Sequence, residues 1–463
     1  MKLILMKYGA NTSRSNDYTV CYKTGKDKGY MELGIMQREW PHKRMRYCIK
    51  LNPSKQEIRS LPKHTELSFI PMDAVGEDGS LDLSTTRPIE DVENGYTFFR
   101  NDDVAIAKIT PCFENGKGCI FRNLVQNYGF GTTELTVMRP TQLVPAYLYY
   151  LTISHRFRTT GIGLMQGSAG QKRVPDDYIR DYKIGLPSEA EQQAIVSFLD
   201  RETSRIDALI QKKERLIELL KEKRIALITQ AVTKGLDPNV PMKDSGIEWL
   251  GEVPEHWDIK KLKHVSTYMV SNVDKKTQEG ETTIRLFNYT DVYNNEFLTN
   301  EMDLMVASAP PGQLDNFIVY TDDVLITKDS EDWKDIAKPA LVKSTAPDIL
   351  CGYHLAMIRP IRGISTGKFL FRALQSTLIN QQFQIASNGV TRYGLPKSAI
   401  GESLITLPSI KEQHEIASHI DQETSKIDNL TSKIISSITL LREYRSSLIN
   451  AAVTGKIDLR EAL

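Results

Sequence analysis

The sequence predicts an α+β fold in which two pseudo-symmetric α/β domains are joined by two long antiparallel helices that form a coiled coil. The first observation is a repeat: Leu186–Val232 recurs 221 positions later as Leu407–Val453, and 26 of 52 aligned residues from position 186 onward are identical. The second is that the preceding domains repeat at shifts of 217 to 220 positions. The third is the apolar spacing of a coiled coil in both repeated stretches.

Each repeated stretch predicts a long helix that begins with a capping box. Ser188 precedes Glu191, and Ser409 precedes Glu412, at the spacing that lets hydroxyl and carboxylate satisfy each other's backbone amides. At about 1.5 Å per residue, each helix would be roughly 45–60 Å long. The predicted helices are residues 187–235 and 408–455.

Apolar residues recur every seven positions in the second stretch, with counterparts in the first, as in a two-helix seam. Lys213 interrupts this seam, and the sequence allows a break near Asp200 and Asp421. The predicted helix–helix core is Ile206, Ile210, Ile217, Leu220, Leu227, Ile427, Ile434, Leu441 and Leu448, with Leu209, Leu216, Leu430, Ile438 and Ile449 widening the stripe.

The domains before the helices look rich in strands. Short runs with β-branched residues are punctuated by Gly, Asn, Asp and Pro. The predicted strands are 104–110, 134–138, 323–327 and 354–358, and the predicted short helices are 143–157 and 367–379. Asp102–Lys108 matches Asp322–Lys328 in this comparison of the two halves.

These patterns divide the chain into seven parts. Residues 1–28 are polar and predict a loosely ordered extension. The others are a first domain (29–186), a first long helix (187–235), a linker (236–256), a second domain (257–407), a second long helix (408–455) and a tail (456–463). If the helices are antiparallel, the tail should lie near Trp40, as the linker lies near Trp257.

Composition is that of an ordinary soluble protein. The 463 residues carry a formal net charge of only +1, which argues against nucleic-acid binding by charge alone. Five scattered cysteines without a C-x-x-C pair make a disulfide framework or zinc site improbable and favour a reducing cytoplasm. We expect neither a signal peptide nor a membrane span.

Several stretches resemble catalytic motifs but lack their spacing. Gly161–Lys172 is rich in glycine yet has no Gly-Lys-Ser/Thr of a phosphate loop. The acidic residues of Pro175–Lys183 lie too close together for a nuclease site, and the second half lacks them. His414 and His419 are one residue too far apart for a zinc H-E-x-x-H motif. We therefore expect no catalytic residue, metal or cofactor in this chain.

The two halves agree in their helices and differ in the loops of their domains. Residues 113–118 stand opposite 333–338, and 166–173 opposite 387–394, with little identity. These loops carry Lys, Arg, Asn, Gln, Ser and Tyr, which can reach phosphates and base edges but are also ordinary surface residues. Helices that match between the halves favour binding of two copies of one partner. Domains with different loops favour recognition of two different ligands.

Many of these motifs resemble the specificity subunits of type I restriction–modification enzymes. The Leu-Pro-Ser-x-x-Glu-Gln helix entry, Leu199–Asp207, Gly246–Trp257, Ile109–Gly118 and Gln166–Pro175 carry the resemblance, which extends from about Gly29 to the end. Residues 1–28 have no place in the family pattern, which makes Met31 and Met36 alternative starts. A second departure is Thr233-Lys-Gly where the other helix has Thr454-Gly-Lys.

The resemblance implies that each domain is a target recognition domain docking on double-stranded DNA. The target would be two unlike half-sites, held apart by a coiled coil acting as a ruler. The helices would dock two methyltransferase (modification) subunits that carry S-adenosylmethionine, and restriction (motor-nuclease) subunits would join with ATP and magnesium. This chain would itself do no chemistry, and it would bind DNA weakly without its partners.

For base readout we select polar and aromatic loop residues in each domain. They are Lys108, Asn115, Lys117, Gln166, Ser168, Gln171, Lys172 and Arg173 in the first domain, and Lys328, Trp333, Lys334, Asn388, Thr391, Arg392 and Tyr393 in the second. Two rival functions remain: a coiled-coil scaffolding adaptor that does not read DNA, and a nuclease or methyltransferase in its own right. The missing motifs disfavour the latter.

Overall fold

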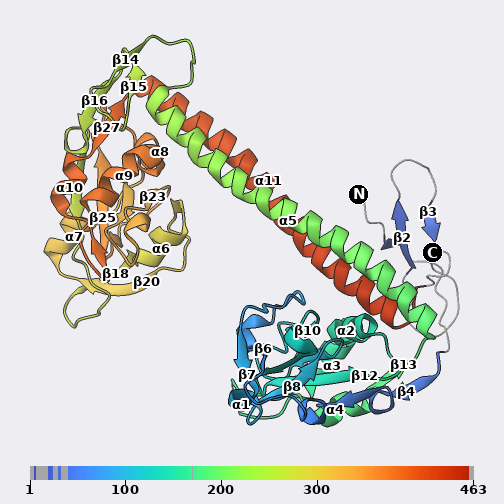
Figure 1. Cartoon of the computed structure of the whole chain (residues 1–463). Coiled ribbons are helices and arrows are strands. Elements are labelled where there is room, and N and C mark those ends of the chain that lie inside the picture. The colour runs from blue at the N-terminus through green and yellow to red at the C-terminus, as the bar shows by residue number, and fades with distance from the viewer. Residues whose placement is uncertain (1–4, 7–18, 24–29, 33–39, 169, 458–463) are drawn as a thin grey trace, which may run out of the picture. The chain divides into compact units, whose positions relative to one another are not determined.

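The computed structural model describes residues 5–6, 19–23, 30–32, 40–168 and 170–457 (Figure 1). The chain divides into two compact units, one of Met1–Lys212 with Ser436–Leu463 and the other of Lys213–Ile435. Each unit therefore combines one α/β domain, which we call a head, with part of each of the two longest helices.

The first head is built on two four-stranded sheets. One has the strand order β10-β9-β12-β5 and is antiparallel, and the other has the order β7-β6-β11-β8, in which β6 and β11 run parallel. The pair β4–β13 leads into the long helix. The elements are β4 (His42–Arg44), β5 (Ile49–Leu51), β6 (Glu66–Ile70), β7 (Thr86–Pro88), α1 (Ile89–Val92), β8 (Thr97–Arg100), β9 (Val104–Ala107), β10 (Gly118–Ile120), β11 (Tyr128–Gly131), β12 (Leu135–Pro140), α2 (Pro145–Ile153), α3 (His155–Gly163), α4 (Asp176–Asp181) and β13 (Lys183–Gly185).

The second head follows a related plan, with one strand more in its main sheet and one fewer in the other. Its five-stranded sheet has the order β17-β25-β21-β23-β19, and a three-stranded sheet has the order β20-β18-β24 with β18 and β24 parallel. The pairs are β14–β15, β16–β27 and β22–β26. The elements are β14 (Met242–Asp244), β15 (Glu252–Pro254), β16 (Asp258–Lys261), β17 (Ser266–Val270), β18 (Thr282–Phe287), α6 (Tyr289–Asn294), β19 (Phe297–Leu298), β20 (Met305–Ala309), α7 (Pro311–Phe317), β21 (Val324–Thr327), β22 (Asp329–Ser330), β23 (Pro339–Val342), β24 (Ile349–Cys351), β25 (Leu355–Pro360), α8 (Gly367–Gln375), α9 (Thr377–Ala386), β26 (Tyr393–Gly394), α10 (Lys397–Glu402) and β27 (Leu404–Leu407).

The strand register confirms the predicted repeat of the heads. Val137 pairs with Ala105 across β12 and β9, and Met357 pairs with Leu325 across β25 and β21. All four predicted strands are present, whereas each predicted short helix is two consecutive helices. The breaks fall at Ser154 and Ser376, residues of the type that favours helix N-caps.

The predicted loosely ordered extension contains strands. β1 (Leu5–Met6) and β2 (Thr19–Lys23) pair antiparallel, so the prediction was wrong for these residues, and β2 also pairs with β3 (Tyr30–Glu32) in the predicted first domain. Thr, Val and Tyr favour strands, and their polar flanks obscured that preference in the sequence. The rest of the segment, and tail residues 458–463, lie outside the described residues.

The two long helices are α5 (Glu189–Lys234) and α11 (Ile410–Val453). Both predicted capping boxes are present: the Ser188 amide donates to Glu191 at 3.0 Å, and the Ser409 amide donates to Glu412 at 3.1 Å. Burial opposes ionisation of Glu412, but hydrogen bonds from His256, Ser409 and Trp257 outweigh it and lower the pKa of Glu412 to about 2.

Within each unit the helices pair in the same antiparallel way. In the first unit Arg445 of α11 donates to Asp207 of α5, with Nε to Oδ1 at 2.9 Å. In the second unit Arg224 of α5 lies 3.3 Å from Asp428 of α11, again through Nε and Oδ1. These are the same two aligned positions with the helices exchanged, which is what a duplicated antiparallel pair predicts.

The predicted seam is the most buried side of both helices, although it is narrower than expected. Ile206, Ile210, Leu220, Ile427, Ile434 and Leu448 are buried, and Ile217, Leu227 and Leu441 are half-buried. Of the residues expected beside the stripe, Ile438 and Ile449 are buried, whereas Leu209, Leu216 and Leu430 are exposed by 42–45%. Two helices bury a narrow stripe on each other, so residues at its edge stay in solvent.

The allowed break near Asp200 and Asp421 is absent, because α5 and α11 run through both positions. Their carboxylates accept hydrogen bonds from Tyr150 and Arg372 of the adjoining heads. An aspartate bound in this way does not compete for the backbone of its own helix.

Both helices end against a tryptophan, as predicted for the tail and the linker. Gly235 (φ +80°) faces Trp257, and Gly455 (φ +70°) faces Trp40. A Cβ on either glycine would lie 3.3 Å or 3.1 Å from the indole, and the left-handed conformation favours glycine. The changed order of Lys and Gly at the two ends therefore moves the terminal glycine by one residue without removing the contact.

Each head also encloses the same buried ion pair. Arg139 binds Asp103 through two hydrogen bonds of 2.7 and 2.8 Å, and Arg359 binds Asp323 through two of 2.8 Å. Both aspartate side chains are 1% exposed. Each pair joins neighbouring strands of the main sheet, β9 with β12 or β21 with β25, and the aspartate also binds a backbone amide at the preceding turn.

Replacing Asp103 with alanine should destabilise the first head by about 3–5 kcal/mol, because Arg139 would remain buried without its bidentate partner. Urea unfolding monitored by circular dichroism measures the change. The matched control is Asp181→Ala, which removes a carboxylate bound to Arg44 and Arg46 on the surface and should cost less than about 1 kcal/mol. Equal effects of the two substitutions would contradict the assignment.

Candidate nucleic-acid interface

In the first head, the predicted loop 166–173 is a hairpin. Gln166 and Arg173 exchange backbone hydrogen bonds of 2.9 and 2.8 Å. Gly167 has a φ of +130°, and a Cβ there would lie 2.8 Å from the Gln171 carbonyl oxygen. The tight turn therefore depends on this glycine, and Ser168, Gln171 and Lys172 are presented to solvent.

The second head has a hairpin at the corresponding place with a different sequence. Asn388 and Gly394 exchange backbone hydrogen bonds of 3.0 and 2.8 Å. Gly389 has a φ of +153°, and a Cβ there would lie 1.9 Å from the Arg392 carbonyl oxygen. Thr391 and Arg392 are exposed on the hairpin.

The two hairpins are attached to their sheets by identical backbone bonds. Lys108 donates to the Glu134 carbonyl at 2.9 Å and accepts from Val174 at 2.9 Å. Lys328 donates to the His354 carbonyl at 2.8 Å, and it accepts from Leu395 at 2.8 Å. The frame beneath the loops is therefore common to both heads.

The side chains beneath the hairpins differ between the heads. In the first, Arg173 binds Glu134 through three contacts of 2.8 to 3.2 Å, and this hydrogen bonding lowers the pKa of Glu134. In the second, Asp329 accepts from His354 at 2.5 Å and from Lys328 at 3.2 Å. Arg173 and Lys328 are thus engaged within their own heads.

A second loop lies beside each hairpin strand. In the first head it holds Asn115, which donates to Glu77 at 2.9 Å, and Lys117, whose ammonium donates to the Met72 carbonyl at 3.1 Å. In the second head it contains η6 (Trp333–Asp335), where Trp333 is 42% exposed and Lys334 is also exposed.

The predicted readout residues therefore fall into two groups. Those exposed on the loops are Asn115, Gln166, Ser168, Gln171, Lys172, Trp333, Lys334, Asn388, Thr391 and Arg392. Those half-buried are Lys108, Lys117, Arg173, Lys328 and Tyr393. Their roles in readout stay predictions, because no nucleic acid is present.

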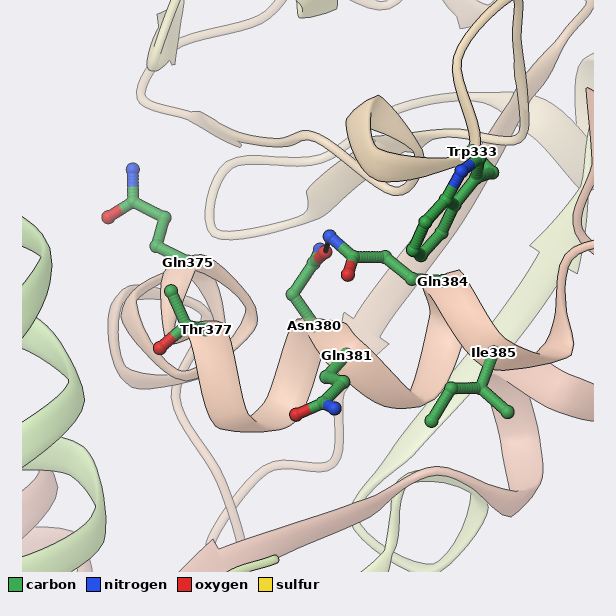
Figure 2. Close-up of a pocket in the computed structure, with 7 residues that line it drawn as sticks. All are labelled: Trp333, Gln375, Thr377, Asn380, Gln381, Gln384 and Ile385. Atoms are coloured by element: carbon green, nitrogen blue, oxygen red, sulfur yellow. Dashed lines mark hydrogen bonds between the residues drawn. The ribbon is translucent and has the colours of Figure 1, made fainter.

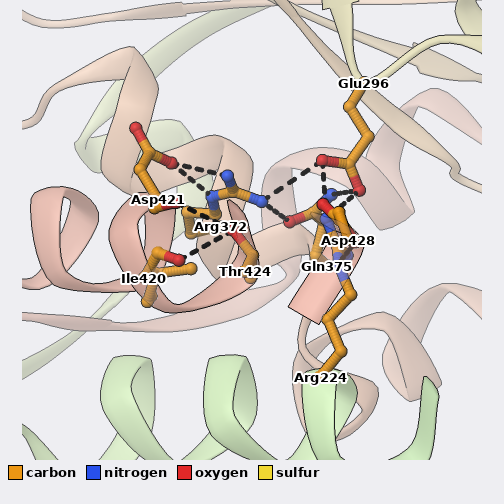
Figure 3. A network of polar contacts seen from close by, with 8 residues as sticks. All are labelled: Arg224, Glu296, Arg372, Gln375, Ile420, Asp421, Thr424 and Asp428. Atoms are coloured by element: carbon orange, nitrogen blue, oxygen red, sulfur yellow. Dashed lines mark hydrogen bonds and ion pairs between the residues drawn. The ribbon is translucent and has the colours of Figure 1, made fainter. Parts of the chain in front are cut away.

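The joint between the second head and its helices is an ionic network (Figure 3). Arg372 of α8, only 2% exposed, donates to Asp421 of α11 and to Gln375. Glu296 accepts from Arg224 of α5 at 2.7 and 2.8 Å and lies 3.4 Å from Arg372. Arg372 and Glu296 thereby join the head to both helices.

The first head uses a neutral donor at the same helix position. Tyr150 of α2 donates to Asp200 at 2.6 Å and lies 3.3 Å from the Thr203 hydroxyl. A glutamine completes each joint: Gln192 accepts from the Val144 amide at 2.7 Å, and its counterpart Gln413 accepts from the Thr366 amide at 2.9 Å.

A family model described as the type I restriction modification DNA specificity domain matches residues 59–219 and 254–440. The chain belongs to this family. The two matches cover most of both heads and most of both long helices, in agreement with the resemblance found in the sequence.

Curated relatives share local similarity with the chain. It is 41% identical over 150 residues to the specificity subunit of the EcoEI type I restriction enzyme and 39% identical over 177 residues to that of EcoAI, both from Escherichia coli. These matches cover 32% and 37% of this chain and only 25% and 29% of those relatives. The putative MjaX specificity subunit of Methanocaldococcus jannaschii is 23% identical over 83% of this chain and 85% of its own length.

Solved structures of the family show the same fold. A chain from a study of complex assembly and conformational transition of the type I R-M system has a TM-score of 0.71 at 15% identity, covering 90% of this chain and 98% of its own. The HsdS subunit from Thermoanaerobacter tengcongensis has a TM-score of 0.53 at 16% identity, covering 90% and 97%.

The two long helices also carry exposed apolar residues that the sequence reasoning missed or placed in the seam. They are Leu209, Leu216, Leu219, Ile225, Leu430, Ile435 and Leu440, between 42% and 61% exposed. The signal was present as apolar residues outside the heptad positions.

Among the described residues, no three His, Cys, Asp or Glu side chains are grouped so as to hold a metal ion. Within the same residues, no helix has the length and apolar content needed to cross a membrane.

Replacing Arg372 with alanine should destabilise the second unit by about 1–3 kcal/mol, because hydrogen bonds to charged groups and the packing of the buried side chain are lost together. Arg372→Lys should recover only part of this, since an ammonium cannot form the planar fork of a guanidinium. Urea unfolding measures both, with Arg201→Ala on the exposed helix face as the control. A loss no larger than that of the control would show that the network does not hold the joint.

Proposed function

We propose that this chain is the DNA sequence-recognition subunit of a type I restriction–modification complex. One observation carries the proposal: hairpins with different side chains stand at the same place on identical backbone frames in the two heads. The proposal assigns one half of a bipartite, asymmetric target to each head. The family to which the chain belongs supports this assignment.

The sequence differences between the two heads lie where base readout would require them. Residues that hold the frame, such as the Asp103–Arg139 pair and its counterpart, are repeated, whereas the hairpin tips are not. Phosphate contacts are independent of sequence, and bases are distinguished by side chains such as Asn, Gln and Arg in the groove. Two different sets of tips on one frame would therefore read two different half-sites.

The exposed loop residues are the stronger candidates for contact with bases. Gln171 and Lys172 stand on the first hairpin, and Thr391 and Arg392 on the second. Arg173, Lys117 and Lys328 would instead shape the loops, because leaving their present partners would cost the ion pairs and hydrogen bonds already formed.

We further propose that the exposed apolar residues of α5 and α11 help to dock two methyltransferase subunits. The helices would also act as the ruler that separates the half-sites, at roughly 34–36 Å per turn of DNA. S-adenosylmethionine would be held by the methyltransferases, and ATP and magnesium by restriction (motor-nuclease) subunits. This chain would contribute no catalytic group. The complex would act in the cytoplasm.

The charge of the chain fits a subunit that acts within a complex. A net charge of +1 provides little of the salt-dependent attraction to phosphates that gives most DNA-binding proteins their affinity. The partners would supply that attraction, and the heads would supply discrimination. Nanomolar, sequence-selective DNA binding by the isolated chain would contradict this division.

Exchanging residues 31–186 for the head of another family member should change one half-site of the methylated motif and leave the other unchanged. The reason is that each head would read its half-site through its own loops. Sequencing of methylated adenines in a host expressing the assembled complex measures the motif. An unchanged motif would favour the scaffolding adaptor, and a change in both half-sites would contradict modular reading.

Replacing Leu219 and Leu440 with glutamate should reduce co-purification of the methyltransferase at least tenfold, because charges would enter an apolar contact surface. The control is Lys221→Glu, an exposed position of the same helix, which should leave co-purification nearly unchanged. Circular dichroism confirms that the variants retain their helices. Normal co-purification of the leucine variant would place the docking surface elsewhere.

A further inference from the structure

The two heads place an aromatic side chain differently in the loop beside the hairpin. In the first head Phe113 is fully buried beneath α3, where Gly161 makes room for it: a Cβ on Gly161 would lie 2.6 Å from the Phe113 ring. In the second head the corresponding residues are Trp333 and Phe383. Phe383 is fully buried from the helix side, and Trp333 is 42% exposed.

The equivalence of these positions is supported by the bonds around them. Arg158 of α3 donates to the Gly116 carbonyl at 3.2 Å, and Asn380 of α9 donates to the Ile336 carbonyl at 3.4 Å. Both helices therefore hold the same loop from the same position. Phe383 is buried at the helix position that corresponds to Gly161, whereas the loop aromatic of the second head, Trp333, is exposed at the surface.

The exposed indole borders a hollow of about 370 Å³ (Figure 2). The hollow is lined by Trp333, Gln375, Thr377, Asn380, Gln381, Gln384 and Ile385. Asn380 and Gln384 are partly used in holding the loop, Gln384 through a 2.9 Å bond to the Lys334 carbonyl. Gln381 is exposed and makes no hydrogen bond to any described residue.

This lining has the chemistry of a site for a nucleobase. An exposed indole face can stack on any base, and amide side chains can donate to and accept from base edges. The Lys334 ammonium, 5.5 Å from the centre of the Trp333 ring, supplies a cation for the adjoining phosphate. An apolar side chain of a protein partner would leave these polar groups without hydrogen bonds.

The hollow borders one predicted readout loop of this head and adjoins the start of the other. Trp333 and Lys334 belong to one of them, and Ile385, 75% exposed, precedes the hairpin that contains Asn388 and Arg392. DNA lying against these loops would bring its bases to the rim of the hollow.

We propose that Trp333 and the α9 face form a stacking site for one nucleobase displaced from the duplex, present in the second head and absent from the equivalent place in the first. The proposal rests on the proposed DNA-recognition function and adds a site that takes a base out of its stack. It makes Trp333 a determinant of affinity that acts through ring stacking rather than through a base-specific hydrogen bond.

The test uses the full chain assembled with its methyltransferase and a duplex that carries one bulged adenine. The comparison duplex carries an abasic residue in the bulge, so that the phosphates are matched. Trp333→Ala should weaken binding to the bulged-adenine duplex about 5- to 100-fold, the range expected for one stacked base. Trp333→Phe should retain most of the affinity, and neither variant should alter binding to the abasic duplex.

Emission of Trp333, isolated by subtracting the signal of Trp333→Phe, should be quenched by the adenine bulge and not by the abasic bulge. The control Tyr47→Ala removes an aromatic ring that is 64% exposed in the first head and should change nothing. Equal effects on both duplexes, or quenching by the methyltransferase alone, would overturn the base site. The head exchange tests DNA recognition separately, through sequence-dependent binding to intact duplexes. A negative result for the base site therefore does not decide whether the chain recognises DNA.

Discussion

The structure depends on the antiparallel pairing of α5 and α11, because each head completes its core with a helix end from elsewhere in the chain. In the second unit, Ile228 and Val232 at the end of α5 are buried with Trp257 of the head and with Ile416 and Ile420 near the start of α11. The α5 end also accepts a hydrogen bond from Thr406 of the last head strand. The head therefore packs on both helices at once.

The first unit is completed in the same way from the other direction. The Tyr147 hydroxyl of α2 donates to the Val453 carbonyl at the end of α11, at 3.2 Å, and Asn450 accepts from the Arg156 amide. The end of α11 thus belongs to a head that lies some 300 positions earlier in the sequence. Each sequence repeat consists of a head and a long helix, and the end of each helix packs on the head of the other repeat. Neither repeat can therefore bury its core alone.

Much of this arrangement could be predicted because it rests on local or repeated signals. The capping serines, the terminal glycines and the constant shift between halves are readable in the sequence and predict helix bounds, corners and register. The width of the seam is not, since periodicity marks Leu209 and Leu430 as apolar without showing how far a single partner helix reaches. Arg173 looks free in the sequence because its partner Glu134 lies 39 positions away.

The joints and the loop aromatics could not be predicted from the sequence for the same reason. In both, the role of one residue depends on a second residue that is distant in the sequence. Tyr150 and Arg372 bind equivalent aspartates but differ in their own charge. The donor at one joint is therefore neutral, and the donor at the other is a cation. Ionic joints are screened and desolvated differently from neutral ones, which lets the two heads differ in how firmly they hold their orientation.

The exchange of Phe113 and Gly161 for Trp333 and Phe383 follows the same logic in the core. In the first head the loop supplies the buried ring and the helix supplies a glycine, whereas in the second head the helix supplies a buried ring and the loop aromatic is exposed. The exposed surfaces of the two heads therefore differ because the buried side chains beneath them differ.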